Sequence, residues 1–312
     1  MMSADKGSFV NDSSNLVSLT EVQQHVHSRI DRKLSDFIAM QTHAADELIS
    51  AMNYSLFSGG KRIRPLLLSI VGDMLGAVQD DVDVASMAIE CIHAYSLIHD
   101  DLPAMDDDAL RRGKPTNHIQ YGEATAILAG DALQTLAFEI VLNHDLSSGN
   151  NSKRIELARM IASASGVNGM CAGQSIDLIA TGKEISLQQL TQLHELKTGA
   201  LLSACVSLAC ILAPNVKQEH IVLLNKYAAS IGLAFQVQDD ILDVISDSET
   251  LGKPQGSDAG LDKNTFVSHL GLEGSQQFLQ KLHLEALLAI SSLPYNTEQL
   301  KELTNFLVKR KY

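Results

Sequence analysis

Apolar residues follow a helical pattern along almost the whole chain. They recur three and four positions apart, as they do on one buried face of a helix. The run from Ala85 to Tyr95 is a clear example, and similar runs cover 126–137 and 221–235. No segment shows the strict alternation of a half-buried strand. The pattern therefore predicts an all-α protein.

Polar and turn residues mark where the predicted helices begin and end. Capping residues stand before the runs 82–102, 124–143, 187–198 and 298–308, namely Asp80-Asp81, Glu123, Ser186 and Asn296-Thr297. Turn residues interrupt the pattern at 59–60, 113–115, 147–151, 214 and 252–260. We expect a bundle of about ten helices or more, joined by mostly short loops.

The 312 residues would allow two ordinary domains, but no linker rich in proline, glycine or serine divides them. We expect one all-helical domain over residues 16–312, after a disordered N-terminus over residues 1–15. Helices 124–143 and 199–212 are apolar over most of their circumference. This indicates burial in a thick bundle or against a second copy of the chain.

Composition is that of a globular protein and excludes some functions. Apolar residues make up 45% of the chain, enough for a large core, and the net charge of -13 argues against nucleic-acid binding. No run of about 18 uninterrupted apolar residues occurs, so no transmembrane segment is expected. The four cysteines lack metal-ligand spacing, which predicts buried thiols in a reducing, cytoplasmic compartment. They are Cys91, Cys171, Cys205 and Cys210.

Two clusters of aspartates each stand at the end of an apolar helical run. They are Asp100-Asp101 with Asp106, and Asp239-Asp240 with Asp243. Carboxylates carried inward need partners, and Mg²⁺ commonly joins one or two carboxylates to a substrate's phosphates. The clusters therefore predict one site with several Mg²⁺ ions. The alternative is a pair of acidic helix ends that face water.

On a regular helix, the aspartates of the two clusters would point in different ways. The three residues of the second cluster span about 100° of arc, so a regular helix directs all of them toward one point. On a continuous helix, Asp106 would lie about 240° from Asp100. Pro103 disfavours helical geometry at the preceding residue. We therefore expect the helix to end there and the chain to turn Asp106 back toward Asp100.

Basic residues supply the other half of the predicted site. Lys61 and Arg64 lie three apart at the start of an apolar helix, so they share a face and can bind one phosphate group, while Arg62 points elsewhere. Arg111 and Arg112 directly follow the first acidic cluster. The alternatives are a solvated helix start for the first group and simple neutralisation of the aspartates for the second.

Further polar residues lie near helix ends, in glycine turns or on apolar helical faces. They are Lys197, Thr198, Lys253, Gln174 and Gln236. Alone, such an amide is more often a satisfied core group. Near a developing positive charge, however, a hydroxyl or amide oxygen stabilises the charge without being a strong nucleophile. With no Ser-His-Asp or Cys-His arrangement, this set indicates departure of a diphosphate rather than acyl transfer.

Six segments together carry a family resemblance. They are GGKRIRP, CIHAYSLIHDDLPAMDDDALRRGKPTNH, AGQSIDL, HELKTGALL, FQVQDDILDV and LGKPQGSD. In this order and at these spacings they resemble the trans-isoprenyl diphosphate synthases, most closely the farnesyl diphosphate synthases, from about residue 30 to about residue 272. The resemblance implies an isoprenoid synthase bundle around a central cavity, a homodimer, and three Mg²⁺ ions per active site.

The resemblance also implies a role for each matching residue. Metal ligands would be Asp100, Asp101, Asp106, Asp239, Asp240 and Asp243. The allylic diphosphate would be bound by Arg111, Lys197, Thr198, Gln236, Lys253 and Lys263. Isopentenyl diphosphate would be bound by Lys61, Arg64, His93 and Arg112. The catalytic residues would be Lys197, Thr198 and Gln236. Residues 266–269 depart from the family's Tyr-Pro pattern, which puts Lys263 in question.

Product length depends in the family on the residues before the first aspartate motif. An aromatic residue at the position of Tyr95, next to Ser96, tends to stop growth at fifteen carbons. Tyr95 lies five residues before Asp100 and therefore more than one turn below it. It favours (2E,6E)-farnesyl diphosphate, made from dimethylallyl and then geranyl diphosphate. Geranylgeranyl and geranyl diphosphate are the alternatives, and the four residues 102–105 do not decide between them.

Other functions fit less of the sequence. A class I terpene cyclase needs no isopentenyl pocket, and a metal-dependent phosphohydrolase built on His93, His99 and Asp100 leaves the second cluster without a role. A subunit that only regulates a partner would not need the metal motifs. The basic C-terminus, from Lys309 to Tyr312, either closes over bound diphosphate or frays into solvent.

Overall fold

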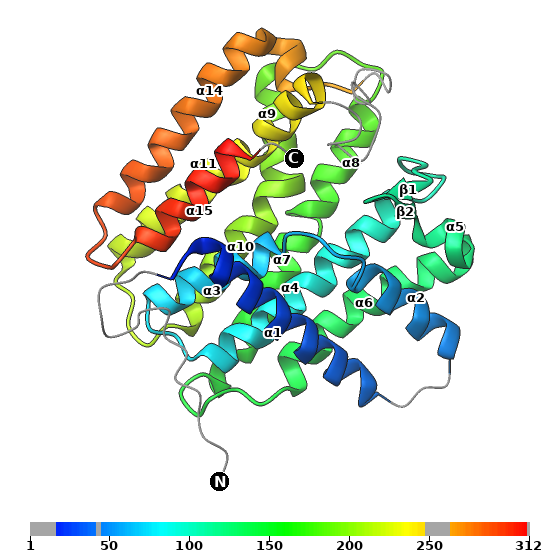
Figure 1. Cartoon of the computed structure of the whole chain (residues 1–312), viewed down its shortest axis with the longest axis vertical. Helices are drawn as coiled ribbons and strands as arrows, with labels where there is room; N and C mark the ends of the chain where they lie inside the picture. The colour runs from blue at the N-terminus through cyan, green and yellow to red at the C-terminus, as the bar shows by residue number, and fades with distance from the viewer. Residues whose placement is uncertain (1–16, 42–44, 247–262, 311–312) are drawn as a thin grey trace.

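The computed structural model describes residues 17–41, 45–246 and 263–310 and confirms the all-α class (Figure 1). The described helices are α1 (Leu19–Ala39), α2 (Asp46–Leu56), α3 (Ile63–Met74), α4 (Gln79–Asp100), α5 (Asn117–Tyr121), α6 (Glu123–Asn143), α7 (Arg154–Ser165), α8 (Met170–Ala180), α9 (Leu187–His194), α10 (Ala200–Leu212), α11 (Gln218–Ile245), α14 (Phe266–Ser291) and α15 (Glu298–Lys309). A 3₁₀ turn, η1 (Asn151–Lys153), and a π-helical turn, η2 (Glu195–Gly199), interrupt them.

Helix α4 runs through the centre of the molecule and ends at the first acidic cluster. It packs against α1, α2, α3, α6, α7 and α10, and its buried residues lie on all sides. A helix with this pattern needs neighbours around its whole circumference. The core of the bundle therefore surrounds α4, and the C-terminal end of α4 opens toward the site.

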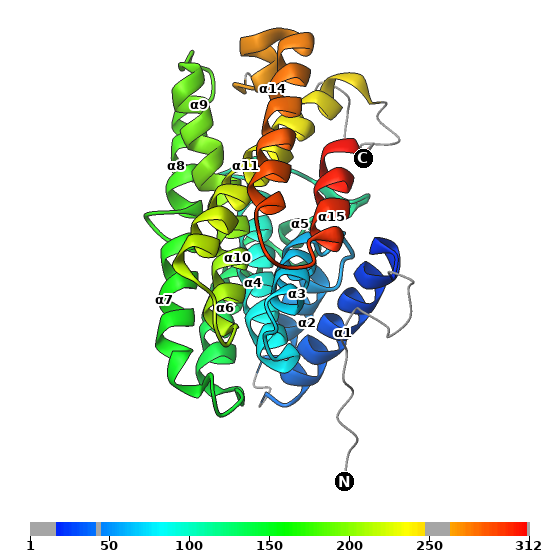
Figure 2. The same cartoon turned by 90° about the vertical axis from the view of Figure 1, so that its left-hand side faces the viewer.

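Helix α11 carries the second acidic cluster and packs along α14. Helix α15 contacts α11, α14 and α3. Figures 1 and 2 show α14 and α15 together beside α11. The end of the chain is thus brought close to the second acidic cluster.

The predicted helix starts are confirmed for three helices, whereas α4 begins at Gln79, before the predicted capping residues Asp80 and Asp81. Helices α6 and α15 begin at Glu123 and Glu298, and Ser186 caps α9 by accepting from the backbone N of Gln189 at 3.2 Å. The predicted helix 187–198 is not uniform, however, because α9 ends at His194 and η2 follows. The predicted break at 252–260 and the predicted disordered N-terminus lie outside the described residues.

The structure contains a short hairpin that the sequence pattern did not predict. Strands β1 (Leu110–Arg111) and β2 (Lys114–Pro115) pair antiparallel. Between them, Arg112 and Gly113 have φ angles of 53° and 74°, as expected for a two-residue hairpin turn. Strands of two residues are too short to show an alternation. Their turn nevertheless sets the direction of the two arginines that follow the first acidic cluster.

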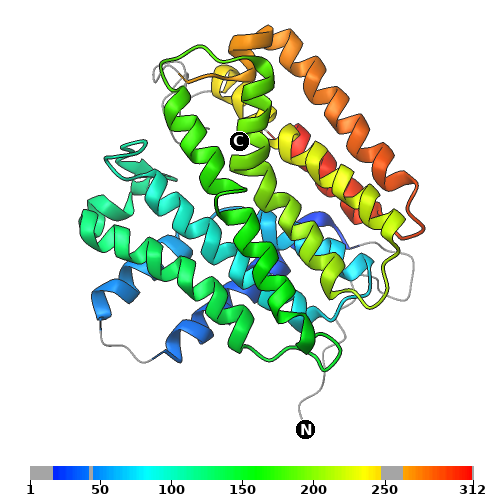
Figure 3. The same cartoon turned by 180° about the vertical axis from the view of Figure 1, so that it is seen from behind.

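The two most apolar helices are covered to different degrees. Helix α10 is mostly buried, whereas α6 exposes Ile127, Leu128 and Leu142. Figure 3 shows α6 at the outside of the bundle. Two stretches, Glu123–Asn143 and Leu187–Leu212, are long and apolar enough to cross a membrane by length and composition alone, a test that the core helices of soluble proteins also pass.

Candidate active site

The first acidic cluster lies where α4 ends. Asp100 is the last residue of α4, and the backbone N of Asp106 donates to the Asp100 carbonyl oxygen at 2.9 Å. The helix end near Pro103 and the return of Asp106 are thereby confirmed. Burial raises the pKa of Asp100 to about 6, with Lys197 opposing the shift and Asp106 adding to it. Carboxylates that repel one another in this way are stabilised by a divalent cation.

Asp101 has a different role from its neighbours. It is 3% exposed and accepts from Arg111, whose Nε lies 2.9 Å and whose Nη2 lies 2.6 Å from Asp101 Oδ1. Arg111 belongs to β1, so the hairpin and the carboxylate together fix its guanidinium. Two-pronged contacts of this kind are geometrically specific. Asp101 therefore positions an arginine beside the cluster.

The second cluster lies on one continuous helix, but its members do not share one direction. Asp239 lines a basic cavity and accepts from Arg310 Nη2 at 2.8 Å. Asp240 is 2% exposed and accepts from the backbone N of Phe266 at 2.7 Å, at the start of α14. The expectation that all three aspartates point to one place is wrong for Asp240. A turn of about 100° between neighbours is enough to direct one carboxylate to the cavity and the next to α14.

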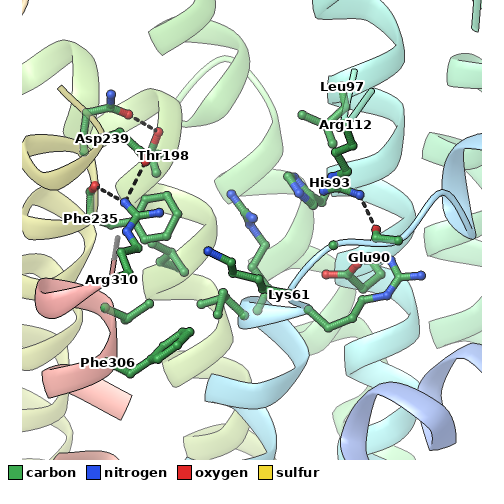
Figure 4. Close-up of a pocket in the computed structure, with 18 of the residues that line it drawn as sticks. Lys61, Glu90, His93, Leu97, Arg112, Thr198, Phe235, Asp239, Phe306 and Arg310 are labelled. Atoms are coloured by element: carbon green, nitrogen blue, oxygen red, sulfur yellow. Dashed lines mark hydrogen bonds and ion pairs between the residues drawn. The ribbon is translucent and has the colours of Figure 1, made fainter. Parts of the chain in front are cut away.

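A cavity of about 490 Å³ contains all four predicted ligands of isopentenyl diphosphate. They are Lys61, Arg64, His93 and Arg112. Arg62, Arg111 and Arg310 also line it, against the acidic side chains of Glu90 and Asp239. Figure 4 shows Lys61 and His93 on one side of this pocket and Asp239 and Arg310 on the other. In a chain with a net charge of -13, this local positive excess marks a site for an anion.

Buried contacts fix the loop that carries Lys61. Arg62 has a φ of 48° and turns inward, as the sequence predicts, to bind Glu90 at 2.5 Å and Asp31 at 2.7 Å. Gln23 of α1 donates to the Lys61 carbonyl oxygen at 2.8 Å. The loop is therefore held from the core and from α1, which leaves Lys61 at the cavity.

The concentration of positive charge shifts the pKa values of the cavity. Burial, together with the charges of Arg64 and Arg112, holds the pKa of His93 well below its ordinary value, so the imidazole is neutral at pH 7. Burial and the charge of Arg310 lower the pKa of Lys61. A bound diphosphate would oppose both shifts, because its negative charge favours the protonated forms of His93 and Lys61.

Lys197 and Thr198 lie in the π-helical turn η2. Such turns are rare and often occur at functional sites. Neighbouring helices must come close to it: a Cβ on Gly173 of α8 would lie 2.2 Å from the backbone N of Lys197. Lys197 Nζ binds Asp177 at 2.6 Å. Burial alone would lower the pKa of Lys197, but Asp177 and Asp100 outweigh it and raise the pKa, so the lysine stays charged.

Neutral oxygens lie next to these charges. Thr198 Oγ1 donates to Gln236 Oε1 at 3.4 Å, and Gln236 Nε2 donates to Asp240 at 3.0 Å. Gln174 lines a second cavity, and within the described part of the chain both of its amide atoms are buried without a hydrogen-bond partner. Since an unpaired buried amide is costly, this side chain is suited to a ligand.

The second cavity, of about 390 Å³, lies below the first acidic cluster between α4 and α8. It adjoins the basic cavity, because Arg64, His93, Leu97 and Thr198 line both. Tyr95 and Ser96 also line it, and the Tyr95 hydroxyl lies 3.3 Å from Cys171 Sγ.

The four cysteines are free thiols, and the predicted burial is confirmed for three of them, Cys91, Cys205 and Cys210. The prediction is wrong for Cys171, which is exposed because it faces the second cavity.

The structure describes two of the remaining three predicted residues. Lys263 Nζ lies 3.3 Å from Asp106 Oδ1, so it joins the first cluster despite the unusual sequence after it. Asp243 is 3% exposed. Lys253 lies outside the described residues.

Two residues at the site were not assigned from the sequence: Arg310 was considered only as part of a basic C-terminus with two possible roles, and Asp177 was missed. Arg310 is buried between Asp239 and Phe235: it donates to the Phe235 carbonyl oxygen at 2.7 Å and lies 3.8 Å over the Phe235 ring. The basic C-terminus is therefore docked at residue 310. The second residue is Asp177, the partner of Lys197. It lies three residues after Gln174 in AGQSIDL, so helical spacing could have identified it.

The acidic groups fit Mg²⁺ in their chemistry. They offer only carboxylate oxygens, which this ion prefers. Within the described ranges, no three His, Cys, Asp or Glu side chains form a ready group of ligands. Instead, Asp106 contacts Lys263 and Asp239 contacts Arg310. This arrangement suits an ion that is held through one or two carboxylates and a substrate's phosphates, and not in a cage of protein ligands.

Comparison with known proteins identifies the family. A model described as "Polyprenyl synthetase" matches residues 45–305. The chain belongs to the polyprenyl synthetase family. This polyprenyl synthetase is 49% identical over 294 residues to farnesyl diphosphate synthase of Haemophilus influenzae, covering 94% of this chain and 98% of the relative. It is 47% identical over 283 residues to farnesyl diphosphate synthase of Escherichia coli, covering 90% and 95%.

A solved structure supports the same fold for this polyprenyl synthetase. The crystal structure of a geranyltransferase from Helicobacter pylori, complexed with magnesium and isoprenyl diphosphate, has a TM-score of 0.82 and 35% sequence identity. The similarity covers 95% of this chain and 98% of that chain. The predicted isoprenoid synthase bundle is thereby confirmed.

Proposed function

We propose that this polyprenyl synthetase condenses isopentenyl diphosphate with dimethylallyl and then geranyl diphosphate, and releases (2E,6E)-farnesyl diphosphate. The observation that carries the proposal is the pair of adjoining cavities. One is basic and suits the diphosphate of isopentenyl diphosphate, and the other contains Tyr95 and suits an apolar chain. The relatives named farnesyl diphosphate synthase support the same product.

The first step breaks the C–O bond between the allylic carbon and its diphosphate. Asp100, Asp106 and Asp239 would hold three Mg²⁺ ions, with Asp101, Asp240 and Asp243 in support, and bound Mg²⁺ would neutralise charge on the leaving diphosphate. Lys197 and Arg111 contribute fixed positive charge at the same place, and the proposal assigns Lys253 and Lys263 to the same set of diphosphate ligands. Charges arranged before the reaction need little reorganisation as the anion forms.

The allylic cation left behind needs stabilisation that does not trap it. Thr198 and Gln236 offer neutral oxygens where the two cavities meet, and the unpaired amide of Gln174 lies on the apolar side. A neutral oxygen dipole lowers the energy of a cation without forming a bond to it. These residues therefore suit the cationic stage of the reaction.

The second step joins two five-carbon units or extends a ten-carbon chain. The basic cavity holds the diphosphate of isopentenyl diphosphate through Lys61, Arg64, His93 and Arg112, so that its double bond faces the cation. The alkene supplies the electron pair for the new C–C bond, and a proton then leaves the adjacent carbon. The departed diphosphate takes this proton. Orientation of the two reactants supplies much of the rate acceleration.

The same proposal covers the state of the protein in the cell. Residues 16–312 would form one domain, located in the cytoplasm, where the four free cysteines stay reduced. The exposed apolar residues of α6, Ile127 and Leu128, suit an interface between two copies of the chain. Size-exclusion chromatography with light scattering would test the homodimer, and a monomer at micromolar concentration would contradict it.

One incubation distinguishes the candidate functions. Purified protein is mixed with Mg²⁺, isopentenyl diphosphate and each allylic starter, and products are separated by chain length. A fifteen-carbon diphosphate supports the proposal, while a twenty-carbon or ten-carbon product supports geranylgeranyl or geranyl diphosphate synthesis. Cyclised hydrocarbon without uptake of isopentenyl diphosphate would indicate a terpene cyclase, and phosphate release from either substrate alone would indicate a phosphohydrolase. Failure to consume any substrate would favour a regulatory subunit.

A further inference from the structure

His99 contacts the ring of Tyr95 from one helical turn above. The two residues are four apart on α4, and helical side chains lean toward the N-terminus, so the imidazole reaches back over the phenol. Their ring centroids are 5.7 Å apart and their planes are at 77°, an edge-to-face contact. Both side chains line the apolar cavity. Tyr95 is therefore held at its ring by His99 and at its hydroxyl by Cys171.

The other side of the imidazole rests on α6. His99 Nε2 lies 3.1 Å from the Ile127 carbonyl oxygen and 3.9 Å from an oxygen of Asp131. Between these two residues, a Cβ at Gly130 would lie only 2.1 Å from His99 Nε2. Two nonbonded atoms cannot approach this closely. The surface formed by Ile127, Gly130 and Asp131, here called the α6 slot, accepts the imidazole only because residue 130 is a glycine.

The ring orientation bears on another role for His99. The residue directly precedes Asp100, which invites the interpretation of a metal-binding His-Asp pair. Its Nε2, however, lies 3.1 Å from the Ile127 carbonyl oxygen of α6. Its contacts lie on Tyr95 and α6.

We propose that His99 is a positioning residue that sets product length. With its imidazole in the α6 slot, His99 holds the ring of Tyr95 across the second cavity, called here the apolar cavity. The inference rests on the proposed function, because product length has meaning only for an enzyme that elongates a chain. The depth of cavity that is open to the allylic tail depends on the rotamer of the Tyr95 ring. An edge-to-face ring contact shifts the ratio of two such rotamers by about 2- to 10-fold.

The first test replaces the imidazole. His99→Ala removes the ring contact, so we expect the ratio of twenty-carbon to fifteen-carbon product to rise by about 2- to 10-fold. His99→Phe keeps a ring against Tyr95 and is expected to keep the fifteen-carbon product dominant. The matched control is His144→Ala, since His144 makes a similar edge-to-face contact with Phe37, at 6.0 Å and 80°, away from both cavities. The control should leave the product ratio unchanged.

The second test pushes the imidazole from the opposite side. Gly130→Ala adds a methyl group in the α6 slot and forces the ring toward the cavity, so the ratio of ten-carbon to fifteen-carbon product is expected to rise. In a His99→Ala background the same methyl group has nothing to displace and should cause no further shift. Gly274→Ala is the control for a new alanine in a helix, because it lies on α14 with Leu270 as its near neighbour.

Two results would overturn the proposal. One is an unchanged product ratio in His99→Ala, or in Gly130→Ala if His99→Ala does not fold. The other is an equal effect of Gly130→Ala with and without the imidazole. If Tyr95→Ala lengthens the product while His99→Ala does not, only the role of His99 is rejected. If the wild-type protein joins no five-carbon units, the proposed function itself fails.

Discussion

Glu90→Gln tests whether the buried ion pair between Glu90 and Arg62 positions the loop of the proposed isopentenyl diphosphate subsite. Glu90 lies on α4, is 2% exposed and binds Arg62 Nη1 at 2.5 Å. Glutamine keeps the size of the side chain and an oxygen acceptor but removes the charge. Of the two carboxylates that bind Arg62, only Asp31 then remains, and its side chain is 29% exposed. The loop that carries Lys61 loses its main anchor in the core.

The magnitude follows from the burial of the pair. Removing one partner of a buried ion pair costs about 3–5 kcal/mol, and an amide that still accepts a hydrogen bond reduces the cost to about 1.5–3 kcal/mol. At about 2–4 °C per kcal/mol, the unfolding midpoint should fall by roughly 3–12 °C. If the loosened loop costs the substrate one charge-assisted hydrogen bond, KM for isopentenyl diphosphate should rise by about 10- to 100-fold.

Steady-state kinetics with each substrate varied in turn provides the assay. We expect KM for isopentenyl diphosphate to rise while KM for the allylic starter stays within about twofold of wild type. Asp83→Asn is the matched control. Asp83 is a fully buried carboxylate on the same helix, bound to Arg29 at 3.0 Å and Lys33 at 2.8 Å, and it lines neither cavity. This control should lose stability and keep both KM values.

Two outcomes would refute the reasoning. An equal rise in both KM values would show a general loosening of the site. A loss of stability with no change in KM for isopentenyl diphosphate would show that the pair between Glu90 and Arg62 supports the fold without positioning Lys61.

Three further predictions follow from the structure. Tyr95→Ala should lengthen the product by at least one five-carbon unit, and an unchanged product by chain-length chromatography would reject Tyr95 as the floor of the cavity. Asp100→Asn and Asp239→Asn should each lower turnover by about 100-fold or more, with helical circular dichroism preserved; near wild-type turnover would contradict their assignment as metal ligands. Burial lowers the pKa of His194 from 6.5 to about 4. Between these values the unfolded state binds more protons, so stability should fall by up to about 3 kcal/mol as the pH drops from 6.5 to 4. His194→Phe should flatten this part of a urea-unfolding series, and an unchanged slope would contradict the assignment.

Local pattern accounts for most of the fold. The starts of α6 and α15 and the end of α4 follow from neighbouring residues, because capping and the apolar period are properties of short segments. The π-helical turn η2 is different. It depends on close approaches by other helices: a Cβ on Gly173 would meet Lys197, and a Cβ on Gly232 of α11 would lie 3.0 Å from Gly199 Cα. The spacing of apolar residues within one helix does not predict such contacts between helices.

The sequence determines which chemical groups are present and on which face of its helix each side chain lies. That information was enough to recognise two acidic clusters, the basic segments and the family they resemble. Tertiary packing decided which of these groups face the ligand and which serve the protein. Asp101 holds Arg111, Asp240 caps α14, and Arg310 reaches Asp239 from the far end of the chain. These partners lie on different elements, so their pairing follows from how whole helices pack against one another and not from the order of residues within any of them.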